Sequence, residues 1–254
     1  MSLYFSNFAV EMIPKRIHYC WFGGGKMPKM IRECIATWHK HMPDWEYVLW
    51  DIAAFSNFPA GVDNTLKHPY VQSAWREQKW AFMTDYVRFW AVYHFGGVYL
   101  DTDMYVVKPL DELLDNPFFT AWGTNEHKLI DCTCYGAEKG HNLCLTLMMN
   151  YDEIIYTRDA QASLVLPHVV TPVILANKES CTIYSYDYFY PYSYEDKQLG
   201  ERLFKKFATP NTYAIHLWNM GWKSCWEIHF GQFVKQVKHF WGIQKKLNII
   251  SKIC

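Results

Sequence analysis

The chain has 254 residues, half of them apolar, and its 25 lysines and arginines balance its 25 aspartates and glutamates. A chain of this length buries a substantial core and fits one domain with a small appendage. The zero net charge excludes a general polyanion-binding surface, so no nucleic-acid partner is expected. Twelve Trp, 18 Tyr and 16 Phe indicate mainly a large core, with single rings available as platforms for sugars or bases.

The first residues, MSLYFSNFAVEM, lack the basic start and the clean apolar run of a signal peptide. No window of the sequence has the apolar length needed to cross a bilayer. The eight cysteines show no metal-type spacing, and a long chain without a secretory signal is expected to keep them as free, buried thiols. These features predict a cytoplasmic protein.

The N-terminal half alternates predicted strands and helices. In chain order, the predicted elements are a strand over 16–22, a glycine loop over 23–25, a helix over 28–41, a strand over 45–50, a helix over 69–94 and a strand over 98–100. Pro28 suits the first turn of a helix, and Gly96 and Gly97 suit the end of one. This alternation predicts an α/β fold with a mainly parallel sheet, in which ligands bind beyond the carboxyl ends of the strands.

The rest of the chain is less regular, with a strand predicted over 129–138, a helix over 141–155 and a strand over 181–191. Its last stretch differs in composition, because six lysines and one glutamate occur from Lys223 onward. We therefore divide the chain into a folded domain over 1–225 and a basic tail over 226–254. The tail is expected to form an amphipathic helix, which either lies on an anionic membrane or docks its apolar face on the domain.

Two aspartates, Asp101 and Asp103, follow the strand predicted over 98–100. Side chains alternate along a strand, so Tyr99, Asp101 and Asp103 share one side if the extended geometry continues. Carboxylates held this close repel each other unless a cation lies between them, and Mg2+ prefers one or two carboxylates together with substrate phosphates. The pair fits half of a metal–diphosphate site, although so common a motif, taken alone, more often marks a solvated acidic turn.

Asp85 and Arg88 lie three residues apart in the helix predicted before the aspartates, so they share a helix face. Arg88 offers a fork for a phosphate or a ribose-side oxygen, and the alternative is an ordinary ion pair within the helix. An EF-hand loop is excluded, because it would need Asp or Asn in place of Tyr105 and Gly in place of Val106.

Three segments, IPKRIHYCWFGGGKMP, WAFMTDYVRFWAVYHFGGVYLDTDM and GAEKGHN, resemble glycosyltransferase family 32. That family holds DXD-containing sugar transferases of capsule and lipopolysaccharide assembly, and Golgi mannosyltransferases. The resemblance runs from about Ile13 to about Trp222. It implies a GT-A fold, with a mixed, mainly parallel sheet flanked by helices, and a nucleotide-sugar donor. It also implies Mn2+ or Mg2+ and transfer with retention to a glycan or lipid-linked glycan acceptor.

Carried over by position, the resemblance implies a catalytic set made of Asp85, Arg88, Asp101 and Asp103. Asp103 would bind the metal directly, and Asp101 would contact the sugar or ribose, with metal contact through water. Asp85 and Arg88 would orient the donor sugar, and Tyr99 would shape the nucleotide pocket.

The ends of the resemblance add three further residues. Trp21, near the end of the first strand, would lie near the base. YAIHLWNMGW resembles the late His motif of the family, so His216 would be the third metal ligand and Trp222 would close over the phosphates. This block departs from the family at Leu217 and Gly221, where a second His or a Ser is common. Without the resemblance, a core histidine is the simpler interpretation of His216.

Two other functions remain open at this point. A haloacid-dehalogenase-type phosphatase would also use Asp101 and Asp103, but its motif stands near the start of its domain, whereas about a hundred residues precede it here. A metal-dependent carbohydrate-binding protein would use the many aromatic side chains without catalysing transfer. The favoured expectation is a cytoplasmic enzyme that touches the inner face of the membrane if its tail binds lipid.

Overall fold

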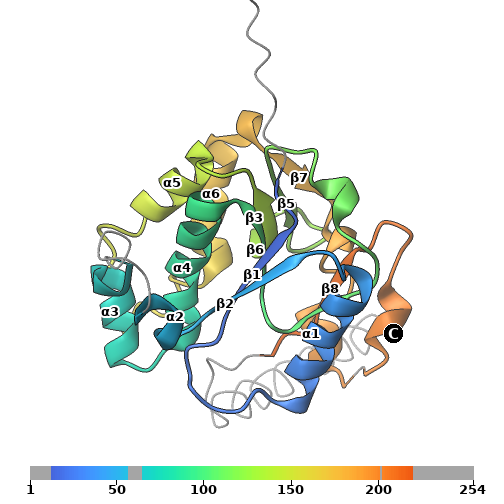
Figure 1. The fold of residues 1–254 in the computed structure, drawn as a ribbon, viewed down its shortest axis with the longest axis horizontal. Coiled ribbons are helices and arrows are strands. Elements are labelled where there is room, and N and C mark those ends of the chain that lie inside the picture. The colour runs from blue at the N-terminus through green and yellow to red at the C-terminus, as the bar shows by residue number, and fades with distance from the viewer. Residues whose placement is uncertain (1–12, 57–64, 201, 220–254) are drawn as a thin grey trace, which may run out of the picture.

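The computed structural model describes residues 13–56, 65–200 and 202–219 (Figure 1). Its strands are β1 (Arg16–Cys20), β2 (Glu46–Trp50), β3 (Gly97–Leu100), β4 (Met104–Val106), β5 (Phe118–Trp122), β6 (Ile130–Ala137), β7 (Thr182–Tyr184) and β8 (Ala214–His216). Its α-helices are α1 (Lys29–His41), α2 (Ile52–Ser56), α3 (Pro69–Arg76), α4 (Trp80–Phe95), α5 (Asn142–Met149), α6 (Leu166–Ala176) and α7 (Tyr194–Gln198). Short 3-10 helices lie at Thr65–Lys67, Asp111–Leu113, Lys178–Ser180, Tyr186–Tyr188 and Phe204–Phe207. A membrane-crossing helix, long and apolar enough to span a bilayer, does not occur in these ranges.

Six strands form one sheet in the order β2-β1-β3-β6-β5-β7, and β4 pairs with β8 in a separate two-stranded sheet. β1 is parallel to both β2 and β3, β6 runs antiparallel to both of its neighbours, and β5 is parallel to β7. Three of the five neighbouring pairs are therefore parallel, which confirms the prediction of a mixed, mainly parallel sheet.

Helices cover both faces of this sheet, as Figure 1 shows, with α3 to α6 on one side and α1 on the other. Strand alternation assigns the side chains of β3 to the two cores. Tyr99 packs with Tyr135 in the core under α4 and α5, whereas Val98 and Leu100 pack with Trp38 of α1 in the second core. The flanking helices predicted from the alternating pattern are therefore confirmed.

The strand β6 contains an irregularity close to the end of β3. The register of its ladder with β5 shifts between Phe119 and Ala121. Residues two apart in a regular strand share a face, yet Cys132 and Cys134 contact the cores on opposite faces of the sheet. A bulge of this kind changes the direction in which neighbouring side chains point, and Asp131 lies directly beside it.

The single helix predicted over 69–94 is in fact two helices, α3 and α4, which was an error of the sequence reading. The break lies at Gln78, whose φ is 54°. The Lys79 N–H donates to Ala74 O over 2.9 Å, and the Gln78 N–H donates to Trp75 O over 2.8 Å. This is the hydrogen-bond pattern of a Schellman C-cap, a position at which glycine is usual. A glutamine there gave no sequence signal for the break.

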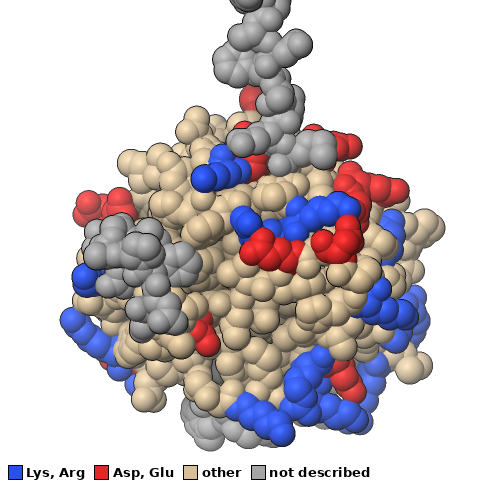
Figure 2. Space-filling model, in the orientation of Figure 1, with Lys and Arg blue, Asp and Glu red and all other residues tan. Residues whose placement is uncertain are grey.

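Other boundaries are shorter than predicted. The strand expected over 181–191 ends at Tyr184 and is followed by a 3-10 helix, and α5 ends at Met149. The six described cysteines are free, five of them buried and Cys181 partly buried, as expected. Most of the face drawn in Figure 2 is neither basic nor acidic, and basic and acidic side chains lie beside one another in its upper part. The tail over 226–254 and the boundary at 225 lie outside the described residues.

His18 of β1 joins three parts of the fold through its two ring nitrogens. Trp50 donates its indole N–H to Nδ1 over 3.0 Å, so Nε2 carries the proton and donates to the carbonyl of Gly96 over 2.9 Å. The imidazole is fully buried, and burial lowers its pKa from 6.5 to about 4. The neutral form therefore holds β1, the end of β2 and the end of α4 together.

We expect the free energy of unfolding to fall as the pH drops from 6.5 toward 4, because the unfolded chain binds a proton at His18 in that window and the folded chain does not. The loss attributable to this group is roughly 2 kcal/mol between pH 7.5 and pH 5. His18→Gln keeps one donor and one acceptor but does not titrate, so its denaturation curves should show a weaker pH dependence. His39→Gln, at an exposed histidine, is the control; parallel pH profiles for wild type and His18→Gln would contradict the assignment.

Candidate functional site

A cavity of about 760 Å³ opens beyond the carboxyl ends of β1 and β3. Its lining comes from the end of β1 and the loop after it, from α4 and the turn before it, from the Asp-Thr-Asp turn, and from several later segments. The residues are Cys20, Trp21, Phe22, Gly23, Gly25, Glu77 to Phe82, Thr84, Asp85, Arg88, Tyr99, Asp101 to Asp103, Asp131, Thr133, Val165 to Pro167, Tyr194, His216, Trp218 and Asn219. All the predicted site residues that lie in the described part of the chain line this cavity. Trp222 lies outside the described residues.

The two aspartates do not continue the strand, contrary to the extended geometry on which their shared side was argued. β3 ends at Leu100, and the chain turns so that the Met104 N–H donates to Asp101 O over 3.0 Å. The two carboxylates still meet, because β4 starts directly after the turn. β4 pairs with β8 in a register that sets Met104 opposite His216. Ligand atoms of Asp101, Asp103 and His216 all lie within 4.8 Å of one another.

His216 is held beside Asp103 in a buried corner. Its Nε2 lies 3.3 Å from Oδ2 of Asp103, while Nδ1 is buried and has no hydrogen-bond partner among the described residues. Burial opposes the charge on His216, but attraction to Asp103 outweighs it and raises the pKa of the imidazole. Burial likewise opposes the charge on Asp103, but attraction to His216 and a 2.6 Å hydrogen bond from the Asn219 N–H leave its pKa lowered.

This donor set fits a divalent cation. Two carboxylates and one imidazole supply oxygen and nitrogen ligands of the kind that Mn2+ and Mg2+ sites use. Nε2 is the ring nitrogen of His216 that lies near Asp103, 3.3 Å from Oδ2, and the ligand atoms of the three residues lie within 4.8 Å of one another. The DXD motif and this buried group suggest divalent metal binding, and the identity of the ion belongs to the proposal below.

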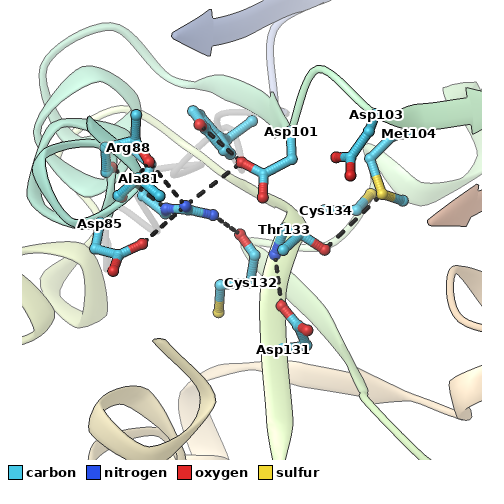
Figure 3. Close-up of polar contacts among 12 residues, drawn as sticks. Ala81, Asp85, Arg88, Asp101, Asp103, Met104, Asp131, Cys132, Thr133 and Cys134 are labelled. Atoms are coloured by element: carbon cyan, nitrogen blue, oxygen red, sulfur yellow. Dashed lines mark hydrogen bonds and ion pairs between the residues drawn. The ribbon is translucent and has the colours of Figure 1, made fainter. Parts of the chain in front are cut away.

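Arg88 lies at the centre of the polar cluster in Figure 3. One terminal nitrogen lies 2.9 Å from Asp85 and 3.4 Å from Asp101, and the other donates to the carbonyl of Cys132 over 2.9 Å. The guanidinium carbon stands 4.6 Å over the ring of Tyr99, whose hydroxyl donates to Asp101 over 3.0 Å. The described donors of Arg88 are thus directed at protein groups, so it fixes the two carboxylates in place.

The charges in this cluster have different environments. Asp85 is buried, and burial raises its pKa to about 8 against the opposing attraction of Arg88. Asp101 is less enclosed, with 24% of its side chain exposed to the cavity side. Arg88 remains charged, since attraction to the surrounding acidic groups holds its pKa above the usual value despite burial. A protonated Asp85 would be a hydrogen-bond donor as well as an acceptor.

Gly97 allows β3 to lie close to β1 just before the site residues. Gly97 has a φ of 121°, and an added Cβ would lie 2.7 Å from the carbonyl oxygen of Arg16. Only a residue without a side chain allows β3 to come this close to β1 at that point. The glycine pair predicted to end the helix therefore also sets the spacing of the two strands that precede the site residues.

The segment after β8 forms part of the site, and the sequence reading missed its anchors. Trp218 has a φ of 53° and lies with its ring centroid 4.2 Å from that of His216. Its indole N–H donates to Tyr192 O over 2.7 Å. The ammonium of Lys197 donates to the carbonyls of Leu217 and Trp218 over 2.7 and 2.6 Å. Lys197 is distant in sequence, so no local pattern indicates that it holds this segment.

Asp131 is a further acidic residue in the cavity that the sequence reading did not single out. It lies in a stretch that reads as an ordinary buried strand, and only the three-dimensional pairing of β6 with β3 brings it to the site. Trp21 lines the cavity just after β1, which ends at Cys20 and not at Phe22 as predicted, and its indole N–H donates to Gly25 O over 2.7 Å.

Residues 28–120 match the family model described as "Glycosyltransferase sugar-binding region containing DXD motif". The match includes the Asp-Thr-Asp turn, Asp85 and Arg88. The resemblance stated from the sequence is confirmed for this segment.

Two curated relatives are similar to part of this chain. Inositol phosphoceramide mannosyltransferase 1 of Schizosaccharomyces pombe is 30% identical over 116 residues, which are 43% of this chain and 34% of the relative. Inositol phosphoceramide mannosyltransferase 3 of the same yeast is 30% identical over 143 residues, or 54% of this chain and 37% of the relative. The chain thus spans about a third of the length of each relative.

Solved structures confirm the fold around the DXD-type region. The PaToxG glycosyltransferase superposes with a TM-score of 0.50 at 19% identity, over 66% of this chain and 70% of that one. The ligand-free glycosyltransferase domain of the YGT toxin gives a TM-score of 0.50 at 10% identity, over 74% and 82%. The predicted GT-A architecture is therefore the architecture of the structure.

Removing the guanidinium of Arg88 should lower the free energy of unfolding. Arg88→Met leaves Asp85 and Asp101 buried or half-buried without their cation, and losing one partner of a buried pair costs about 3 to 5 kcal/mol. Arg158→Met is the matched control, because the Arg158–Glu77 pair is exposed and such pairs contribute under about 1 kcal/mol. Urea denaturation measures both; equal losses in the two variants would show that Arg88 is not a structural centre.

Proposed function

We propose that this protein transfers a sugar from a nucleotide-sugar donor to an acceptor hydroxyl. One observation carries the proposal. Asp101, Asp103 and His216 converge in a buried corner of a large cavity, and the two aspartates belong to a DXD-type sugar-binding region. A carboxylate-rich corner of this kind suits a cation that neutralises a diphosphate leaving group.

The metal proposal is Mn2+ or Mg2+, held by Asp101, Asp103 and His216. When bound, such an ion stabilises the negative charge that develops on the departing diphosphate. Arg88 and Tyr99 hold the carboxylate of Asp101 in the orientation that this requires. The Asn219 N–H and His216 do the same for Asp103.

The rest of the donor would lie along the cavity. Trp21 and the neighbouring glycine loop provide an aromatic end suited to the base, and Asp85 is available to a sugar hydroxyl. Arg88 contributes fixed positive charge near the diphosphate while its own hydrogen bonds stay within the protein. We keep Trp222 as a further donor-binding residue, proposed from the resemblance alone.

The finer identity of the reaction rests on the relatives. Both curated relatives are named as mannosyltransferases, so mannose is the first sugar to test. Their names also specify a lipid acceptor, and we propose a glycan or lipid-linked glycan acceptor here. We propose retention at the anomeric carbon, with the departing phosphate taking the proton of the acceptor hydroxyl. A role in capsule or lipopolysaccharide assembly, a cytoplasmic location and membrane contact through the tail are part of the same proposal.

The first experiment compares donors on the full chain. Thermal shift and donor hydrolysis are measured with UDP-, GDP- and CMP-sugars, each with Mn2+, with Mg2+ and with a chelator. We expect one nucleotide-sugar class to stabilise the protein and to be turned over only with metal. Hydrolysis of p-nitrophenyl phosphate instead would favour the phosphatase alternative. Binding of free glycan without turnover of any donor would favour the carbohydrate-binding alternative.

A second experiment tests the metal ligands. Asp103→Asn should lower metal-dependent donor turnover by more than about 100-fold, because it removes a charged ligand from the corner. The fold should survive, since the substitution keeps the shape of the side chain. Asp115→Asn, at an exposed aspartate outside the cavity, is the matched control. Full turnover by Asp103→Asn, or turnover unaffected by chelator, would remove the central claim.

The stereochemical part has its own test. Once an accepted donor is found, the anomeric configuration of the product is determined by NMR. Retention predicts an α linkage from an α-linked donor. A β linkage would overturn retention and leave the transferase proposal in place.

A further inference from the structure

Asp131 lies in β6 and lines the cavity that also contains the metal corner. β6 runs antiparallel to β3, and the Asp101 N–H donates to Thr133 O over 2.8 Å. Residues of β6 before Thr133 therefore extend past the carboxyl end of β3, where ligands bind in this type of sheet. Asp131 lies two residues further along β6, beside the irregularity in its ladder with β5, and both Asp131 and Thr133 line the cavity.

The cavity crosses three neighbouring strands in a fixed order. Trp21 follows β1, the metal corner at Asp101 and Asp103 follows β3, and Asp131 lies in β6; the sheet order is β1, β3, β6. A ligand whose aromatic part lies at Trp21 and whose diphosphate lies at the metal corner would continue toward Asp131. One strand spacing, about 4.8 Å, separates β3 from β6, which is of the order of one sugar ring.

The carboxylate of Asp131 is held rigidly. Its backbone carbonyl accepts two hydrogen bonds, from the Thr120 hydroxyl over 2.9 Å and from the Tyr190 hydroxyl over 3.0 Å. One carboxylate oxygen accepts the Thr133 N–H over 3.0 Å, a bond drawn in Figure 3. Only 4% of the residue is exposed. Its direction is therefore set before any ligand arrives, which lowers the entropic cost of recognition.

Asp131 also lacks a direct cationic partner in the described part of the chain. Arg88 and His216 act on it from a distance, while its contacts are with the hydroxyl-bearing and amide groups of its neighbours. One oxygen of this buried carboxylate accepts the Thr133 N–H, and Asp131 lines the cavity, where a ligand can offer further hydrogen bonds to the carboxylate. It repels a phosphate, so the donors it suits are the hydroxyls of a neutral ring.

We propose that Asp131 is a specificity-determining residue that accepts hydrogen bonds from hydroxyls of the donor sugar. The inference rests on the proposed nucleotide-sugar function and adds a subsite to it. Asp131 supplies one wall of this subsite, and Asp85, on the adjacent part of the lining, supplies another. Together they select the sugar by hydrogen bonds to its hydroxyls. The metal corner and Trp21 bind the nucleoside diphosphate, which many donors share.

The test separates the sugar from the rest of the donor. Calorimetry with Mn2+ measures binding of UDP against UDP-glucose, and of GDP against GDP-mannose, to the full chain. Asp131→Asn should weaken the binding of the nucleotide sugar that wild type accepts by about 10- to 100-fold. This is the effect of losing a hydrogen bond to a charged group. Binding of the matching nucleoside diphosphate should stay within about two-fold. Asp152→Asn, at an exposed aspartate, should change neither.

The remaining outcomes are distinguishable. If wild type binds neither nucleoside diphosphate nor nucleotide sugar with Mn2+, the proposed function itself fails. If Asp131→Asn binds the nucleotide sugar as tightly as wild type, or loses sugar and diphosphate equally, the subsite assignment is overturned. Unchanged sugar affinity with lost transfer would place Asp131 on the acceptor side and also overturn it.

A second measurement does not depend on the variant being stable. Wild type is titrated with donors that each lack one sugar hydroxyl. At least one such donor should bind about 10-fold more weakly, and in Asp131→Asn the same deletion should cost little, because the partner is already gone. Equal binding of every deoxy donor to wild type would contradict the subsite.

Discussion

The buried guanidinium of Arg88 is the interaction on which the site depends. It ties α4, through Asp85, to the end of β3, through Asp101, and to β6, through the carbonyl of Cys132. Without a cation, several buried or partly buried carboxylates would face one another, and their repulsion would oppose the fold. Arg88 offsets part of that repulsion permanently. The corner formed by Asp103 and His216 retains a donor set that suits a second, exchangeable cation.

Topology explains how residues from distant parts of the chain reach this guanidinium. The central strands deliver Trp21 and Asp101 at the same edge of the sheet, because β1 and β3 are parallel neighbours. β6 returns antiparallel and brings Asp131 to that edge from the opposite direction. His216 arrives through a separate strand pair, and the segment after it is fastened by Lys197. The site therefore requires both sheets to be formed.

The sequence predicted those parts of the site that depend on local pattern. Asp101 and Asp103 follow a short apolar run, and the helical spacing of Asp85 and Arg88 already placed them on one face. The metal role of His216 came from the resemblance, since its chain position alone favoured a core histidine. Asp131 and Lys197 carried no signal, because their positions depend on strand pairing and on a long-range hydrogen bond. The helix break at Gln78 was missed for a related reason, since its backbone conformation is the one usually marked by glycine.

The bulge in β6 makes the composition of the cavity sensitive to chain length as well as to residue type. In a regular ladder, a shift of one residue turns every following side chain to the other face of the sheet. Here the irregularity lies between Cys132 and Cys134, which contact opposite cores, and Asp131 precedes it. Loss of one residue within this short interval would turn the residues that precede it, Asp131 included, to the other face of the sheet. Related chains with the same aspartates but a different residue count there would present a different wall to the ligand.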